Sequence, residues 1–155
     1  MAVPVAYEPL VRKFRRFIRD EEDINTLLEA EESTDQLLYD CIVDALEEIN
    51  WMHEPTTEFT LDQISSGNDG IPWVIVRSGA TLQYLTSAGI HSSRNTFTYS
   101  DGSGIQVQDT DTYGRYINYY NILIPKYERL VASFKRKKNM EDCYGGQASE
   151  YGDLW

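Results

Sequence analysis

The sequence predicts a mainly α-helical protein, a small bundle of about four helices with one β-hairpin inserted before the long last helix and an extended C-terminal tail. Three observations support this fold class. Apolar residues recur at helical intervals in four stretches of the 155-residue chain. A short alternating pattern surrounds a glycine-rich break between the third and fourth stretches, and helical periodicity disappears after residue 138. We therefore expect one helical domain over residues 1–138 and an extended partner-binding tail over residues 139–155.

The first helix is predicted over residues 8–19, where Pro9 suits a first helical turn. Its apolar face consists of Leu10, Phe14, Phe17 and Ile18. Residues 20–32 combine a high acidic content with an apolar patch at Ile24, Leu27 and Leu28. This segment is compatible with a second short helix or with an ordered loop.

The clearest helical pattern, "STDQLLYDCIVDALEEINWM", covers residues 33–52, with Ser33 or Thr34 as its N-cap. Its wide apolar face, which belongs in the core, consists of Leu37, Leu38, Cys41, Ile42, Ala45, Leu46 and Ile49. Because Cys41 shares this face, a core thiol is a better interpretation than a disulfide with Cys143, the other of the two cysteines.

The connection over residues 53–70 is rich in turn formers, and "EFTLDQI" within it fits a short strand or one helical turn. A third helix follows in "IPWVIVRSGATLQYLTSAG", residues 71–89. The run "WVIV" favours a strand in isolation, but Trp73, Val76 and Ala80 fall at helical intervals. Pro72 suits the first turn of this helix, and Gly89 suits a left-handed stop.

A β-hairpin is predicted at about residues 96–108, in "FTYSDGSGIQVQ". Apolar residues alternate on both sides of a flexible turn, and the residues that define the hairpin are Phe97, Tyr99, Asp101, Gly102, Ile105 and Val107. An isolated two-stranded hairpin is marginal in water. We therefore expect this one to lean on the helices or to pair with a hairpin of another copy.

The last helix is predicted to begin after a cap at Asp109 or Asp111 and to run for six turns. Its apolar stripe consists of Tyr113, Tyr116, Ile117, Tyr120, Leu123, Ile124, Tyr127, Leu130, Val131 and Phe134. Most of these tyrosines are expected to pack in the core. Pro125 predicts a kink in the helix or a joint between two helices.

The C-terminal tail carries large aromatic residues that a solubilising segment does not need. Its candidate binding residues are Tyr144, Gly145, Gly146, Tyr151, Leu154 and Trp155. The tail is compatible with a disordered end, or with a segment that becomes ordered on a partner surface with the aromatics as anchors.

No catalytic, metal-binding or cofactor-binding constellation is recognised. The chain has two histidines, His53 and His91, and contains no zinc motif, nucleophile elbow, P-loop or dinucleotide fingerprint. "DTDTYGRYINYY", residues 109–120, resembles a calcium loop but has tyrosine at positions five and twelve, where oxygen ligands are required. We therefore expect a protein that is not an enzyme and has no cofactor.

The charge balance is strongly acidic, with 14 basic and 25 acidic residues and a net charge of −11. This argues against a main role in gripping nucleic acid through its phosphates. Two basic clusters, "RKFRR" at 12–16 and "KRKK" at 135–138, are expected to support helix ends and partner contacts, including the acidic runs of a neighbouring copy. The N-terminus lacks a signal-peptide pattern and no window is apolar enough for a membrane span, which predicts a cytosolic chain.

The order of these elements resembles the head-to-tail connector proteins of tailed bacteriophages, also called adaptor or head-completion proteins. The matching segments are the helices "STDQLLYDCIVDALEEINW" and "IPWVIVRSGATLQYL", the hairpin "FTYSDGSGIQVQDTD" leading into "TYGRYINYYNILIPKYERL", and the tail from Asn139 onward. The resemblance spans most of the chain and lies in layout rather than in an invariant motif.

The resemblance implies a virion structural protein at the head-tail junction, present in the host cytoplasm during assembly. It implies a dodecameric ring under the portal protein, through which double-stranded DNA passes without sequence-specific binding, and a docking surface for the next tail or neck protein. By the family pattern, the tail residues named above bind the portal, and the hairpin contacts the tail side or a neighbouring subunit. The free protein is expected to be a monomer, since like-charged copies repel. The alternative is a small helical regulatory or nucleic-acid-binding protein; a weaker one is an enzyme with a concealed carboxylate site.

Overall fold

The computed structural model of this protein describes residues 3–21, 33–54, 56–65, 70–94, 98–100, 106–108 and 110–143. This part of the chain is mainly helical, as the sequence predicts. Its four α-helices are α1 (Glu8–Ile18), α2 (Asp35–Trp51), α3 (Trp73–Arg94) and α4 (Thr110–Cys143). Two single 3-10 turns, η1 (Val5–Tyr7) and η2 (Leu61–Gln63), lie before α1 and between α2 and α3.

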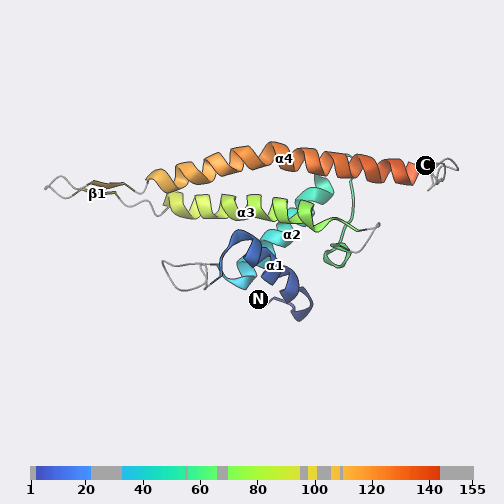
Figure 1. The fold of residues 1–155 in the computed structure, drawn as a ribbon, viewed down its shortest axis with the longest axis horizontal. Helices are drawn as coiled ribbons and strands as arrows, with labels where there is room; N and C mark the ends of the chain where they lie inside the picture. Colours follow the sequence, from blue (N-terminus) through green and yellow to red (C-terminus); the bar gives the residue numbers. More distant parts are fainter. Residues whose placement is uncertain are drawn as a thin grey trace, which may run out of the picture.

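The four helices are not all aligned along one axis. Helices α3 and α4 run side by side in opposite directions, α2 crosses beneath them, and α1 packs against α2 on the side away from α4 (Figure 1). The core therefore forms where α2 crosses the α3 and α4 pair.

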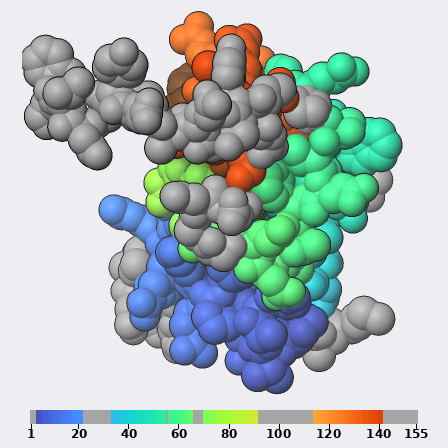
Figure 2. All heavy atoms as spheres, turned by 90° about the vertical axis from the view of Figure 1, so that its right-hand side faces the viewer, coloured from blue at the N-terminus to red at the C-terminus, as the bar shows by residue number. Residues whose placement is uncertain are grey.

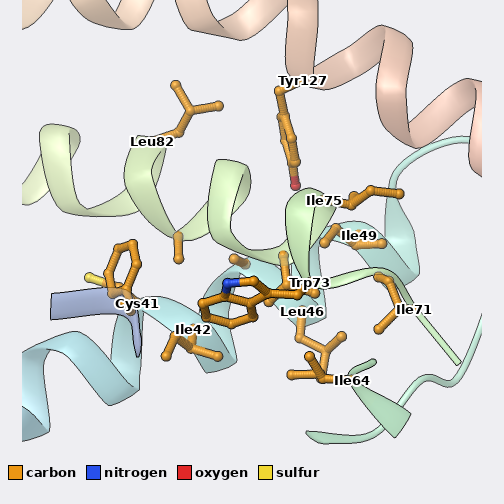
Figure 3. Packing of buried hydrophobic residues seen from close by; sticks show 14 of the residues in the cluster. Cys41, Ile42, Leu46, Ile49, Ile64, Ile71, Trp73, Ile75, Leu82 and Tyr127 are labelled. Carbon is orange, nitrogen blue, oxygen red and sulfur yellow. The ribbon is translucent and has the colours of Figure 1, made fainter. Parts of the chain in front are cut away.

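Buried apolar side chains from all four helices fill this crossing. Figure 3 shows Tyr127 reaching from α4 toward Ile49 of α2 and Ile75 of α3. Fully buried side chains in the core include Phe14, Leu38, Ile42, Ile49, Ile71, Val76, Tyr127 and Val131. The prediction that the apolar face of residues 33–52 belongs in the core is confirmed for Leu38, Cys41, Ile42, Ala45, Leu46 and Ile49.

The starts and ends of the helices agree with the sequence in most places. Thr34, rather than Ser33, caps α2, since its hydroxyl accepts a hydrogen bond of 3.3 Å from the backbone N–H of Leu37. Helix α1 ends at Ile18, and its C-cap residue Arg19 has a left-handed φ of 59°. In the connection after α2, the sequence "EFTLDQI" was compatible with a short strand or one helical turn. It contains the 3-10 turn η2, and a β-bridge between Ile64 and Ile71 follows.

The predicted helix stop at Gly89 does not occur, and of the two alternatives predicted for Pro125 the joint between two helices does not occur. Helix α3 does not stop at Gly89 but continues to Arg94, and buried Gly89 packs beside Tyr116 of α4, so tertiary contact maintains the helix through a residue of low propensity. Pro125 lies inside the continuous helix α4, which Figure 1 shows with a shallow bend. Helix α4 also continues past the predicted boundary at residue 138 to Cys143, so the tail can begin no earlier than residue 144.

Two short strands lie between α3 and α4. Strand β1 (Thr98–Ser100) pairs antiparallel with β2 (Gln106–Gln108), with Tyr99 opposite Val107. The residues that join them, 101–105, lie outside the described part of the chain. The predicted hairpin, with its apolar face and its contacts, therefore stays a prediction.

A buried arginine fastens α1 to the start of α2. Arg15 is 4% exposed and contacts Asp20 at 2.9 Å, Asp35 at 2.8 Å and the carbonyl oxygen of Ser33 at 2.7 Å. The backbone N–H of Ser33 also donates to Asp20, at 3.0 Å. This network ties together the two ends of residues 22–32, which lie outside the described residues, so the choice there between helix and loop stays open.

Candidate functional site

Helix α4 connects the two ends of the molecule. Its 34 residues give it a length of about 50 Å at 1.5 Å per residue. The paired strands precede its N-terminal end, and residues 144–155 follow its C-terminal residue, Cys143. The two segments predicted to bind partners therefore leave α4 at opposite ends.

A buried lysine anchors the C-terminal half of α4. Lys135 is 1% exposed, and its ammonium donates to the carbonyl oxygens of Asn50 at 3.0 Å and His53 at 3.2 Å. Asn50 belongs to the last turn of α2 and His53 follows it, so the positive charge meets the negative end of the α2 dipole. Burial lowers the pKa of Lys135. The interaction fixes α4 on the end of α2.

A close approach of three helices fixes the middle of α4. The buried hydroxyl of Tyr127 donates to Glu48 of α2 at 3.5 Å, and the Gln83 amide of α3 donates to the same carboxylate oxygen at 3.1 Å. Burial, followed by the charge of Glu48, raises the pKa of Tyr127. Gly79 permits this approach, because a Cβ there would lie 2.9 Å from the Tyr127 hydroxyl and 3.0 Å from the Cβ of Ala45.

The surface of α4 that points away from the core is basic with apolar ends. We call it the basic α4 face; its exposed residues, spaced three or four apart, are Ile122, Lys126, Arg129, Ser133, Arg136 and Met140. Ile122 is 71% exposed and Met140 is 60% exposed. Among the described residues, no ion pair is formed by Lys126, Arg129 or Arg136, so these charges remain available to a partner.

The surface of α2 that points away from the core has the opposite charge. We call it the acidic α2 face; its exposed residues, again spaced three or four apart, are Asp40, Asp44, Glu47 and Trp51. Trp51 is 81% exposed. Partial burial raises the pKa of Asp44, and the neighbouring charges of Glu47 and Asp40 raise it further.

A structured loop borders Trp51. The Asn50 side chain donates to the Phe59 carbonyl at 3.0 Å and accepts from the Phe59 N–H at 2.9 Å and from the Thr57 hydroxyl at 3.0 Å. These bonds hold the loop against the end of α2. The loop and α2 together enclose an open hollow lined by Glu47, Asn50, Trp51, Thr56, Thr57, Glu58, Phe59 and Thr60. An aromatic ring with carboxylates on either side is thus presented on a fixed surface.

An apolar groove lies near the end of the α3 and α4 pair that carries the strands. It has a volume of about 250 Å³ and is lined by Leu85, Thr86, Gly89, Ile90, Tyr116, Ile117 and Tyr120. Tyr116 and Tyr120 are half-buried, and Ile117 is 39% exposed. The described residues therefore only partly cover Tyr116, Ile117 and Tyr120, whereas Tyr127 lies in the core as predicted.

The residues predicted to bind partners fall mostly outside the described part of the chain. This holds for the tail residues Tyr144, Gly145, Gly146, Tyr151, Leu154 and Trp155, and for the hairpin residues Phe97, Asp101, Gly102 and Ile105. Tyr99 and Val107 are cross-strand partners in the β1 and β2 pair. The structure therefore places the backbones of Tyr99 and Val107 side by side. The roles of the other predicted site residues stay predictions.

The basic clusters are divided between buried and exposed roles. In "RKFRR", Arg15 is buried in the network with Asp20, while Arg16 pairs with Glu21 at 3.1 Å. In "KRKK", Lys135 is buried against α2, while Arg136 and Lys137 are exposed. Lys135 lies inside α4, which continues to Cys143, and stabilises the end of α2 rather than an end of its own helix as predicted.

The described residues offer no cluster of histidine, cysteine or carboxylate side chains that could hold a metal ion. The calcium-like segment is helical from Thr110 onward, so it does not form an ion-binding loop there. Cys41 is a free, buried thiol, as predicted, and burial raises its pKa to about 11. No helix in the described ranges has the length and apolar character that crossing a membrane requires.

Comparisons with known proteins find no family model, no curated protein and no solved structure that matches this chain. The surface that sequence reasoning missed is the acidic α2 face with Trp51. Its signal was present, because Asp40, Asp44, Glu47 and Trp51 recur at helical spacing opposite the apolar stripe of α2.

Proposed function

We propose that this protein is a virion structural protein of a tailed bacteriophage that forms the head-to-tail connector ring under the portal protein. In this role it extends the DNA channel and provides the docking surface for the next neck or tail protein. It catalyses no reaction. It assembles in the host cytoplasm and ends in the virion at the head-tail junction.

The observation that carries this proposal is the span of α4. One helix of 34 residues, fixed to α2 by Tyr127 and Lys135, has the paired strands at one end and leads into the C-terminal tail at the other. A protein that joins two larger assemblies needs contact elements on opposite sides of a rigid body. Helix α4 supplies the rigid connection between them.

The charge of the chain is compatible with a DNA channel. A net charge of −11 lets double-stranded DNA slide past a like-charged wall without being held. The tail aromatics Tyr144, Tyr151 and Trp155 are assigned to the portal, as anchors of the kind that large aromatic side chains provide. The hairpin is assigned to a neighbouring subunit or to the tail side.

The test is a truncation that stops at Cys143, where α4 ends. Removing residues 144–155 should leave the helical fold and its thermal unfolding unchanged and should abolish binding to the purified portal ring. A second variant, Tyr151→Ala with Trp155→Ala, should weaken binding, whereas the matched control Gln147→Ala with Ser149→Ala should not. Full portal binding by the truncated chain would reject the assignment of the tail.

One observation favours the alternative function of a nucleic-acid-binding protein. The basic α4 face places Lys126, Arg129 and Arg136 along one side of a helix, which is an arrangement suited to phosphates. Binding of this kind weakens steeply with added salt. Tight duplex binding by the wild-type chain at moderate ionic strength, lost on reversing these charges, would replace the connector proposal.

A further inference from the structure

The acidic α2 face and the basic α4 face are complementary and lie on different sides of one rigid molecule. In Figure 2, α4 (orange to red) lies at the top, while α2 and the loop after it (cyan to green) lie along the right-hand side. Each face points away from the core of its own chain, so the two cannot meet within one copy. Contact between them requires a second copy.

We propose that the acidic α2 face of one copy binds the basic α4 face of the next copy, and that this contact is the interface between neighbouring subunits. The inference deepens the proposed connector and rests on that proposal only for the closure of the subunits into a ring. A contact between two different patches is heterologous. Repetition of such a contact generates a ring when the rotation between copies closes.

Charge identifies the occupant of each face. Within the described ranges, Asp44 and Glu47 have no cationic partner. Partial burial, followed by repulsion from Glu47 and then Asp40, raises the pKa of Asp44. A basic neighbour would relieve this repulsion. The basic α4 face offers Lys126, Arg129 and Arg136 without ion pairs of their own in the described residues.

Trp51 provides the apolar centre of the interface. A tryptophan ring that is 81% exposed and bordered by carboxylates suits an arginine guanidinium, through cation–π attraction and ion pairing together. Arg129 and Arg136 lie two helical turns apart on the basic α4 face, with exposed Ile122 and Met140 at its two ends. Aromatic and arginine anchors surrounded by charged residues are typical of binding hot spots. Nucleic acid could neutralise the basic α4 face but would be repelled by the acidic α2 face, so a second copy satisfies both surfaces.

The interface is tested with two charge-reversal variants of the full chain. The acid-face variant carries Asp44→Lys and Glu47→Lys, and the base-face variant carries Arg129→Glu and Arg136→Glu. Self-association is measured by sedimentation velocity at low ionic strength over a range of protein concentrations. Circular dichroism and thermal unfolding confirm that every variant is folded.

The net charge of −11 opposes self-association of free copies, so wild-type protein should be a monomer when dilute and should self-associate as its concentration rises. Each variant alone should associate at least about tenfold more weakly, because like charges then face each other. Mixing the two variants should restore association, since the reversed α2 face of one matches the reversed α4 face of the other. The control Glu8→Lys with Glu128→Lys changes the net charge as much as the acid-face variant does, outside both faces, and should associate like wild type.

Three results would overturn the interface. These are a wild-type chain that stays monomeric under all of these conditions, single variants that associate like wild type, and a mixture that fails to restore association. Duplex DNA binding that is lost in the base-face variant, without any self-association, would assign the basic α4 face to nucleic acid. If mixing the variants restores association but the protein is absent from virions, the interface is supported and the connector proposal is rejected. If the protein is present in virions and the charge-reversal variants assemble there like wild type, only the interface is rejected.

Discussion

Replacing Gly79 with alanine should destabilise the protein, although the same change stabilises most helices. Alanine is favoured over glycine in a helix interior by about 0.5–1 kcal/mol. Here the new Cβ would lie 2.9 Å from the Tyr127 hydroxyl, 3.1 Å from the Tyr127 ring and 3.0 Å from the Ala45 Cβ. Overpacking of a core costs about 1–3 kcal/mol. The net loss in the free energy of unfolding should be about 1 kcal/mol.

Gly114 of α4 provides a matched control, because a Cβ there has no atom within 4 Å. Gly114→Ala should stabilise the protein by about 0.5–1 kcal/mol through helix propensity alone. Urea denaturation followed by circular dichroism measures both variants. The two alanine variants should differ by about 1–3 kcal/mol, the steric cost at Gly79. Equal stability of Gly79→Ala and Gly114→Ala would contradict the close approach of α2, α3 and α4 at Gly79.

Four further changes have distinct expected results. Arg15→Met should lower the free energy of unfolding by about 3–5 kcal/mol, because it leaves buried Asp20 without its countercharge. Lys135→Met should cost about 1–3 kcal/mol, since two carbonyl oxygens lose their donor. Trp51→Ser should change stability by less than about 0.5 kcal/mol, because the side chain is exposed, but should weaken self-association. In a Cys143→Ser background, the Cys41 thiol should react at pH 8 about a hundredfold more slowly than in the unfolded chain, since its pKa is raised from 9.0 to about 11.

The same pKa shift at Cys41 fixes the sign of a pH effect on stability. The folded-state pKa is higher than that of the unfolded chain, so the contribution of this thiol is fully present below pH 9.0 and is lost as pH rises from 9.0 toward 11. Denaturation at a series of alkaline pH values, with and without Cys41→Ala, measures the effect. An unchanged slope after Cys41→Ala would contradict it, as would rapid labelling of the native thiol.

Equal stability of Arg15→Met and wild type would mean that the Asp20 network does not hold α1 to α2. If Lys135→Met is as stable as wild type, the hydrogen bonds from Lys135 to the end of α2 do not stabilise the fold. Unfolding caused by Trp51→Ser would show that its side chain supports the fold rather than a partner contact.

Local pattern predicted the helices well because their apolar faces are long. The spacing over residues 33–52 identified α2 and its buried face, and helical spacing of Trp73, Val76 and Ala80 correctly outweighed the strand preference of "WVIV". The prediction of a stop at Gly89 was wrong, because helix propensity is a weak preference that tertiary packing overrides, and Tyr116 of α4 packs beside Gly89.

The candidate site was less predictable because it depends on how the helices cross. The sequence shows "KRKK" as one cluster. Lys135 lies four residues after buried Val131 and so shares its face of α4, but its partner, the Asn50 carbonyl, depends on the position of α2. Similarly, "RKFRR" gives no sign that Arg15 will bind Asp20 and Asp35 in the same chain rather than acids of another copy. The exposed stripe that ends at Trp51 was readable from spacing, whereas its loop and hollow were not.

The connector proposal is tested most directly by electron microscopy of particles purified from cells that produce the virus encoding this chain. We expect a ring of this protein beneath the portal at the head vertex, with α4 extending between the portal side and the tail side. Absence of the protein from purified particles, by density and by mass spectrometry, would contradict it.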